Sequence, residues 1–207
     1  MNYTKQIEKS CYEFNRYMTK PRWCSLWHQI RELQELNPKR VLEIGTGPGL
    51  FKAIATHLGI EIETLDYDPD LQPDYVASAT EIPLDDGTFD VVCAFQVLEH
   101  LPYEASLKAF GEMARVSSRF VLISLPDARR VWRYHINSHD FLIPRPRLTA
   151  RVHKFEGEHY WEINKRGYSL ARVIADLTKQ TRLMRTYRVY EYPFHRFFVF
   201  EKTPSAS

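Results

Sequence analysis

The chain carries an acidic residue and three glycines at alternate positions around a short apolar run. These are Glu43, Gly45, Gly47 and Gly49 within the segment VLEIGTGPGL. Glycines at such a turn let the backbone approach a bound ligand closely, because no side chain stands in the way. A second carboxylate, Asp66, follows 21 positions after Gly45, where it could accept hydrogen bonds from both hydroxyls of a ribose. The spacing indicates a ligand of the adenosine type.

Two classes of adenosine ligand share this arrangement. Dinucleotide-binding folds place their glycines in the pattern G-x-G-x-x-G, whereas Leu50 occupies the position of the last glycine in this chain. The NAD hypothesis is therefore weakened, although the glycine pattern alone does not remove it.

Short apolar strands alternate with amphipathic helices along most of the chain. This alternation indicates a parallel sheet covered on both faces, so the predicted fold class is doubly wound α/β. Ligands of such sheets bind beyond the carboxyl ends of the strands, which is where the glycine-rich turn begins. The strands are predicted at residues 41–44, 60–65, 75–77, 89–95 and 120–125.

Helices are predicted before, within and after this region, and two strands finish the chain. The final strands, 183–190 and 194–200, are separated by too few residues for a crossover helix, so they should be antiparallel neighbours. The first helix ends at Pro38. The predicted helix faces consist of Trp23, Leu26, Trp27, Ile30 and Leu33; of Leu50, Ile54 and Leu58; of Leu107, Phe110 and Ala114; and of Leu170, Val173, Ile174 and Leu177.

The ordered set of motifs resembles the class I S-adenosylmethionine-dependent methyltransferases, most closely their small type 11 members. The resemblance covers about residues 38–200. It implies a Rossmann-like seven-stranded sheet of order 3-2-1-4-5-7-6, with the last strand antiparallel, and S-adenosyl-L-methionine as the cofactor. The motifs are Glu43-x-Gly45-x-Gly47-x-Gly49, Leu65-Asp66-Tyr67-Asp68, Ala79-Thr80-Glu81-Ile82-Pro83-Leu84, Phe89-Asp90-Val91-Val92 and Gln96-Val97-Leu98-Glu99-His100-Leu101-Pro102.

The resemblance also implies which residues hold the cofactor. Glu43 is expected at its amino-acid end and Asp66 at its ribose, although either carboxylate could instead only brace its turn. Two departures are present: Ser78 stands where the family usually has Asp, and the segment 67–74 is too short for a crossover helix, so that edge should be thin. The expected cofactor-binding residues are Glu43, Gly45, Thr46, Gly47, Gly49, Asp66, Tyr67, Ala79, Thr80 and Gln96.

The segment after the fifth strand shows no clean period and interrupts the alternation. We expect an excursion from the core there rather than a second domain, with residues 1–207 forming one domain. Its expected parts are an N-terminal helical lid (1–38), a cofactor-binding core (39–125), the excursion on the acceptor side (126–165) and a final helix with an antiparallel strand pair (166–207).

Two histidines are candidates for the general base that an acceptor hydroxyl would need. His100 follows the fourth strand and should lie near the mouth of the site, and His159 could reach it from the excursion. Histidines in such places are also commonly structural. No metal is predicted, because His135, His139 and Asp140 have helical ligand spacing but lie near prolines without a further obvious ligand.

The excursion is basic and aromatic. Between Pro126 and Glu156 it has seven basic residues against three acidic ones, whereas the whole chain has a formal net charge of +2. This pattern suits a small-molecule or glycan-like acceptor that carries a phosphate or carboxylate. It could also suit RNA, and a solvated basic loop accounts for it equally well. The basic residues are Arg129, Arg130, Arg133, Arg145, Arg147, Arg151 and Lys154.

Three functional hypotheses follow. The leading one is methyl transfer from S-adenosylmethionine, by in-line displacement, to oxygen or nitrogen of a small-molecule or glycan-like acceptor. An RNA methyltransferase is the alternative among enzymes, although no Asn/Asp-Pro-Pro-aromatic set follows the fourth strand and Cys93 has no preceding proline. A non-catalytic sensor or scaffold that binds the cofactor is the third.

The composition of the chain indicates in which cellular compartment the protein is expected. The chain has no apolar run near the length that crosses a membrane, and its N-terminus is too polar for a signal peptide. Its three cysteines are too widely spaced to suggest a disulfide framework. We therefore expect a cytoplasmic protein without a membrane partner, and the sequence does not indicate its oligomeric state.

Overall fold

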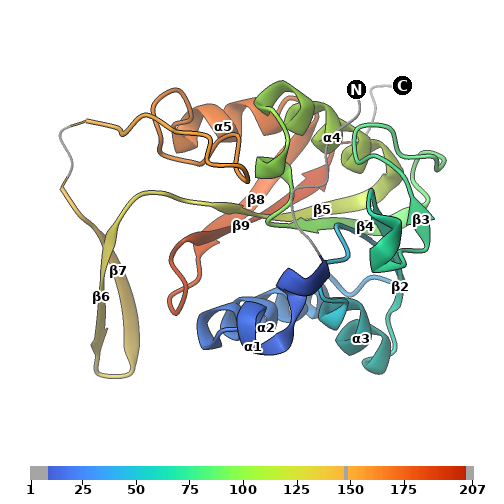
Figure 1. Cartoon of the computed structure of the whole chain (residues 1–207), viewed down its shortest axis with the longest axis horizontal. Coiled ribbons are helices and arrows are strands. Elements are labelled where there is room, and N and C mark those ends of the chain that lie inside the picture. Colours follow the sequence, from blue (N-terminus) through green and yellow to red (C-terminus); the bar gives the residue numbers. More distant parts are fainter. Residues whose placement is uncertain (1–8, 147–148, 204–207) are drawn as a thin grey trace.

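A seven-stranded sheet forms the centre of the molecule in the computed structural model, which describes residues 9–146 and 149–203 (Figure 1). Its strands span Arg40–Ile44 (β1), Glu61–Asp66 (β2), Tyr75–Val76 (β3), Phe89–Phe95 (β4), Ser117–Pro126 (β5), Thr181–Arg188 (β8) and His195–Lys202 (β9). Their order is β3-β2-β1-β4-β5-β9-β8, and β9 alone runs in the direction opposite to the other strands of this sheet. The predicted Rossmann-like, doubly wound order with an antiparallel last strand is confirmed.

Helices cover both faces of the sheet. They span Phe14–Tyr17 (α1), Lys20–Leu36 (α2), Leu50–His57 (α3), Tyr103–Val116 (α4) and Leu170–Leu177 (α5). Figure 1 shows α2 and α3 on one face and α4 and α5 on the other. Phe197 and Phe198, consecutive in β9, are buried in the two opposite apolar layers, as alternation along a strand requires. No helix among the described residues is both long enough and apolar enough to cross a membrane.

The long helix α2 departs from its predicted apolar face. Leu33 is fully buried, but Trp23 and Trp27 are 48% and 57% exposed. The helix instead turns the carboxylate of Glu32 into the protein, where it pairs with the guanidinium of Arg185 in β8. An internal ion pair therefore replaces part of the expected apolar contact, and it ties α2 to the last strands.

The edge of the sheet at β3 is thin, as predicted. Only a 3-10 turn, Pro69–Leu71 (η2), lies between β2 and β3. β3 itself has two residues that pair with Leu65 and Asp66. Within the described residues, no crossover helix therefore covers this edge of the sheet.

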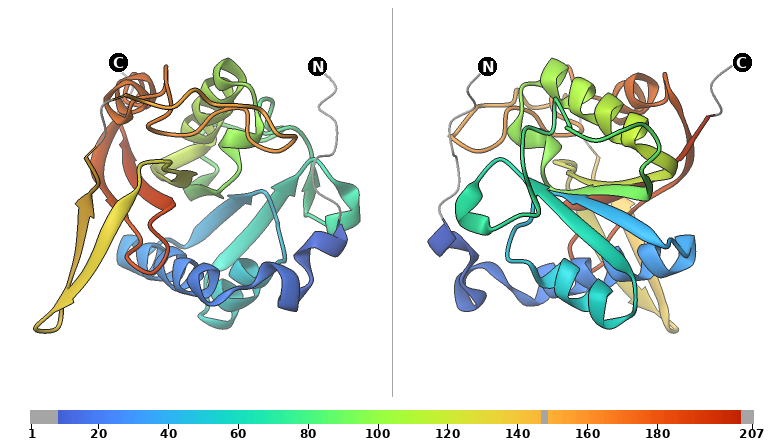
Figure 2. Two further views of the ribbon diagram at one scale, coloured as in Figure 1. Left: turned by 60° about the vertical axis from the view of Figure 1, so that its left-hand side comes forward. Right: turned by 90° about the vertical axis from the view of Figure 1, so that its right-hand side faces the viewer.

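The excursion after β5 contains a β-hairpin that the sequence did not predict. Strands Val131–Ile136 (β6) and His139–Pro144 (β7) pair with each other in a separate sheet, which projects from the body of the molecule (Figure 2). Asn137 and Ser138 form the turn with φ of +47° and +65°, the left-handed pair that a two-residue hairpin loop needs. Because Asn-Gly is the usual signal for this turn, Asn-Ser gave no clear indication.

Candidate functional site

The turn after β1 is held in a conformation that glycine permits. Gly45, Gly47 and Gly49 have φ of +83°, +50° and +72°. The N–H of Gly45 donates to the carbonyl of Leu65 in β2 over 2.8 Å. A Cβ added at Gly45 would lie 2.5 Å from Cγ2 of Val97, so this position cannot carry a side chain without a rearrangement. The turn is therefore packed between the ends of β1, β2 and β4, and it leads directly into α3.

Glu43 brings a carboxylate to the same edge of the sheet. The residue is 5% exposed, and its Oε2 has no hydrogen-bond partner among the described residues. Burial raises the pKa of this carboxyl well above its usual range, an effect that Lys52 opposes. Since a buried oxygen without a donor is unfavourable, the arrangement suits a ligand that brings a donor, such as an ammonium group.

Asp66, at the end of β2, fastens the turn. Its Oδ2 accepts from the backbone N–H of Thr46 over 2.8 Å, and its Oδ1 accepts from the N–H of Asp68 over 2.9 Å. Burial raises the pKa of Asp66, and these two backbone hydrogen bonds oppose that effect. Each carboxylate oxygen can accept more than one hydrogen bond, so the bracing role and the predicted ribose role are compatible.

Hollows open on both sides of the glycine-rich turn. The first lies between the N-terminal helices and the strand ends, and its lining includes Tyr17, Arg22, Glu43, Gly45, Gln96 and His195. The second is lined by Ser10, Tyr12, Glu13, Thr46, Gly47, Pro48, Gly49 and Leu71. An extended ligand that crosses the turn would enter both.

Gln96, directly after β4, has a strained backbone. Its φ of +57° is uncommon for a residue with a side chain. The N–H of Gln96 donates to the carbonyl of Ser124 over 3.0 Å, and its side-chain amide donates to Oγ of Ser124 over 3.1 Å. These two hydrogen bonds hold the residue where it lines the first hollow.

Three of the expected cofactor-binding residues, Tyr67, Ala79 and Thr80, follow β2 and β3. Tyr67 is 50% exposed beyond β2, and Ala79 packs on the core layer that contains α4. The N–H of Thr80 donates to Oγ of Ser78 over 3.2 Å, and their hydroxyl oxygens are 2.9 Å apart. Ser78, which stands in place of the family's usual Asp, therefore stabilises a local turn. Binding of the cofactor by these three residues stays a prediction.

The two candidate bases lie together. The ring centroids of His100 and His159 are 5.1 Å apart. Burial, aided by His159, lowers the pKa of His100 to about 4. Burial also acts to lower the pKa of His159, but hydrogen bonding to Glu162 and the charge of Glu99 raise it overall. Neither ring is among the described residues that line the two hollows, so their role as bases stays a prediction.

His195 is a site residue that the sequence did not suggest. Its ring lines the first hollow, and its Nδ1 is 2.8 Å from Oγ of Ser25. Burial, together with Arg22 and His159, lowers the pKa of His195 to about 3. One signal was available: His195 begins β9, and an antiparallel last strand must begin at the carboxyl edge of the parallel strands.

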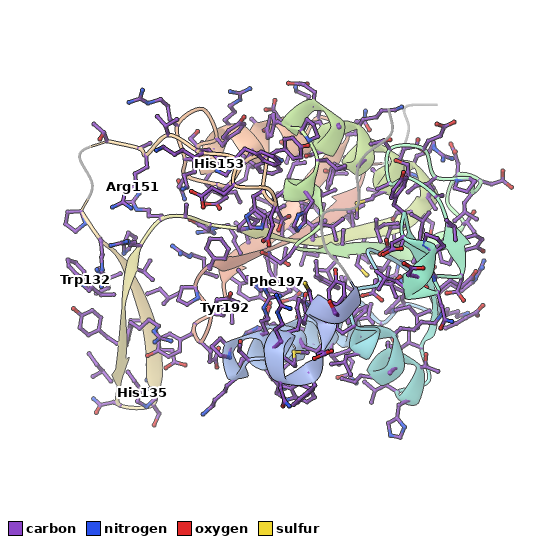
Figure 3. All side chains as sticks on the ribbon, viewed as in Figure 1. Trp132, His135, Arg151, His153, Tyr192 and Phe197 are labelled. Atoms are coloured by element: carbon purple, nitrogen blue, oxygen red, sulfur yellow. The ribbon has the colours of Figure 1, made fainter. Side chains whose placement is uncertain are left out.

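The residues with metal-ligand spacing in the sequence lie on the hairpin instead. His135 and His139 do not occupy a helix, so their i, i+4 spacing does not place them on one helix face. Nδ1 of His135 is 2.8 Å from Oδ1 of the exposed Asp140. Figure 3 shows His135 on the projecting hairpin, apart from Tyr192 and Phe197 beside the central sheet. Arg147, one of the predicted basic residues of this segment, lies outside the described residues.

Comparison with known proteins shows the family to which the chain belongs. Residues 14–172 match the methyltransferase domain family. The ubiquinone biosynthesis O-methyltransferase of Nitrosococcus oceani is 22% identical over 165 residues, which are 65% of this chain and 70% of the relative. The fold is that of the class I S-adenosylmethionine-dependent methyltransferases. More particularly, the chain belongs to the methyltransferase domain family.

Two solved structures illustrate the shared fold. A Burkholderia thailandensis 1,6-didemethyltoxoflavin-N1-methyltransferase, solved with 1,6-didemethyltoxoflavin and S-adenosylhomocysteine, aligns with a TM-score of 0.62 at 14% identity, over 94% of this chain and 85% of that one. The N-methyltransferase NodS of Bradyrhizobium japonicum, solved with S-adenosylhomocysteine, aligns with a TM-score of 0.61 at 11% identity, over 92% of each chain. At these identities the likeness concerns the fold alone.

Proposed function

We propose that this chain transfers the methyl group of S-adenosylmethionine to an oxygen or nitrogen atom of a small-molecule or glycan-like acceptor. The observation that carries the proposal is the buried carboxylate of Glu43. Its Oε2, which has no hydrogen-bond partner among the residues that the structure describes, lies beside a bare glycine-rich turn, and its side chain lines a hollow together with Arg22 and His195. A cofactor with an ammonium group and an acceptor with a negative group would each find a counterpart there.

The residues present fit S-adenosylmethionine. Glu43 would accept from the ammonium group of the amino-acid end, and Asp66 would accept from the ribose hydroxyls while it holds the turn. Gly45 keeps the backbone bare where a Cβ would collide with Val97. The other residues proposed to bind the cofactor are Thr46, Gly47, Gly49, Tyr67, Ala79, Thr80 and Gln96.

The chemistry asks for little from side chains. When bound, the cofactor supplies a methyl group that its sulfonium already activates. The protein then has to align the acceptor atom in line with that methyl group and exclude water, and such orientation can save roughly 7–11 kcal/mol of barrier. Tyr17 and Arg22 form a wall of the first hollow, in agreement with a lid made by the N-terminal helices.

A hydroxyl acceptor would also need to lose a proton. His195 lines the hollow but its low pKa makes it a hydrogen-bond acceptor that orients the hydroxyl rather than a proton carrier near pH 7. His100 and His159 remain the candidate bases, and the raised pKa of His159 suits that role better than the lowered pKa of His100.

The acceptor is proposed to be a small molecule with a negative group. Arg22 lines the first hollow, and its guanidinium carbon lies 4.1 Å from the ring centroid of Tyr17. A cation held in this way can pair with a carboxylate or phosphate at the wall of the site. The names of the O-methyltransferase and N-methyltransferase relatives support small-molecule acceptors at oxygen or nitrogen.

Calorimetric titration with S-adenosylhomocysteine, with NAD as the parallel control, tests the proposal. We expect saturable binding of S-adenosylhomocysteine alone, followed by turnover in a screen of anionic small molecules and glycans. Binding of NAD alone, or of neither compound, would contradict the proposal. Binding without turnover of any acceptor would favour a sensor or scaffold instead.

A further inference from the structure

Three ligating side chains meet beside the first hollow although the sequence separates them. Glu99 and His100 end the 3-10 helix Leu98–His100 (η3) that follows β4, whereas His159 comes from the returning part of the excursion. One ligating atom of each of the three residues lies within 4.8 Å of the other two. The two histidines are 59 residues apart in the chain, so no local sequence pattern could indicate that they lie together.

No described neighbour satisfies the carboxylate of Glu99. The residue is fully buried, and neither of its oxygens has a hydrogen-bond partner within residues 9–146 and 149–203. A buried ionised carboxylate is strongly unfavourable unless a cation and donors meet it. His159 is close enough to influence it, but one imidazole does not satisfy two oxygens. A bound cation at this point would satisfy the carboxylate.

Both histidines are oriented as metal ligands commonly are. Nδ1 of His100 is 3.1 Å from the carbonyl oxygen of Glu158, and Nδ1 of His159 is 3.2 Å from a carboxylate oxygen of Glu162. Because a carbonyl and a carboxylate only accept, each Nδ1 carries the proton. The proton on Nδ1 leaves Nε2 as the unprotonated nitrogen of each ring, which is the tautomer that hydrogen bonds to Nδ1 impose on metal-binding histidines.

We propose that Glu99, His100 and His159 bind one divalent first-row transition ion, such as Co²⁺, Zn²⁺ or Mn²⁺. Two imidazoles with one carboxylate favour these ions over Mg²⁺ and Ca²⁺, which prefer oxygen ligands. Ligand atoms about 2.1 Å from an ion are at most about 4.2 Å apart, so the cluster can close around it with shifts of roughly half an ångström. The proposal replaces the sequence-based expectation of no metal, which rested on His135 and His139.

The location gives such an ion a use in the proposed reaction. Arg22, Tyr17 and His195 line the first hollow, and each has an electrostatic interaction with Glu99 or His159. Three protein ligands leave a coordination position for an oxygen of the acceptor, whose hydroxyl would lose its proton more easily there. Neither histidine would then act as a base. This consequence rests on the proposed function, whereas binding of the ion does not.

Titration of the full chain with Co²⁺, after removal of any purification tag, tests the site. Calorimetry and visible absorption should show one Co²⁺ per chain, and Mg²⁺ should not compete. Glu99→Gln and His159→Gln should each weaken binding at least tenfold while far-ultraviolet circular dichroism is unchanged. The double variant His135→Gln/His139→Gln removes two exposed hairpin histidines, and this control should bind Co²⁺ as the unchanged protein does.

Each other result overturns or refines the proposal. Absence of Co²⁺ binding, or undiminished binding in both cluster variants, would overturn it, and so would a loss confined to the hairpin variant. Glu162→Gln keeps the three ligands and removes only the partner of His159, so a smaller loss would support the site. Titration of the same samples with S-adenosylhomocysteine separates the two proposals. A protein that binds Co²⁺ but does not bind S-adenosylhomocysteine would contradict only the proposed function.

Discussion

At the scale of single residues, Gly45 combines a backbone requirement with a packing requirement. Its φ of +83° disfavours any side chain, and Val97 occupies the space that a Cβ would need. Gly59, after α3, has almost the same φ, +82°, but nothing lies within 4 Å of its Cβ position. Substitution of Gly59 therefore measures the free-energy cost of the backbone conformation alone, whereas substitution of Gly45 measures that cost together with the cost of the contact with Val97.

Gly45→Ala is expected to be more damaging than Gly59→Ala. The left-handed backbone costs about 1–2 kcal/mol for alanine at either position. Overpacking against Val97 should add roughly 1–3 kcal/mol at Gly45 and should weaken S-adenosylhomocysteine binding. Urea denaturation and calorimetry of both variants measure these effects. Equal losses of stability would show that Val97 does not constrain the turn.

Glu43→Gln is expected to move stability and cofactor affinity in opposite directions. The amide removes a buried carboxyl whose pKa burial raises, so the free energy of unfolding without ligand should increase at neutral pH. It also removes the negative acceptor for an ammonium group, so S-adenosylhomocysteine should bind roughly tenfold or more weakly. Glu81→Gln, at an exposed position, is the control variant. If Glu43→Gln bound S-adenosylhomocysteine as tightly as the unchanged protein does, Glu43 would not belong to the cofactor site.

The residues predicted from the sequence and those missed differ in how far apart their partners are in the chain. Glu43 and Gly45 belong to one short motif, and Asp66 follows the next strand, so spacing alone could suggest a shared site. Ser25 and His195 meet across 170 positions. Their contact depends on the packing of α2 against β9, which no local pattern specifies.

At the scale of elements, the hairpin differs from the other described parts of the excursion because its hydrogen bonding is largely its own. β6 and β7 pair from Val131–Pro144 to Ile136–His139, and the N–H of Arg145 donates to the carbonyl of Arg130 at the base. One face of the hairpin is exposed and apolar, with Trp132 opposite Ile143 and Tyr134 opposite Phe141. The periodic core elements were predictable, whereas this pairing depended on an unusual turn.

Replacement of residues 131–144 by two glycines is expected to leave the core intact. The ends of the hairpin are already joined by the Arg145–Arg130 hydrogen bond, 3.0 Å long, so a short link can close the gap. The free energy of unfolding should change by less than about 0.5 kcal/mol, because the removed surface is largely exposed. Urea denaturation and S-adenosylhomocysteine titration measure both properties, and a large loss in either would show that the hairpin supports the site.

At the scale of the whole molecule, buried and partly buried groups couple stability to pH with opposite signs. The folded state raises the pKa of Glu43 and Asp66, so these groups favour folding less as the pH rises above their unfolded pKa values. It lowers the pKa of His28 and His195, mainly through burial, so these groups favour folding less as the pH falls below about 6.5. The difference in free energy of unfolding between a variant and the unchanged protein, followed against pH, is therefore more informative than the pH profile of the unchanged protein alone.

The difference in free energy of unfolding between the unchanged protein and the variant His195→Asn is expected to decrease as the pH falls. Below pH 6.5 the unfolded state binds a proton at His195, while the folded state, with a pKa of about 3 beside Arg22, does not. The gap should therefore shrink by about 2 kcal/mol between pH 7 and pH 5, since each pH unit contributes up to about 1.4 kcal/mol. Urea denaturation at both pH values measures it, with His57→Asn, at an exposed position of α3, as the control. A gap that stays constant or widens would mean that His195 is protonated in the folded protein, and its assignment as a neutral hydrogen-bond acceptor for the substrate would then be wrong.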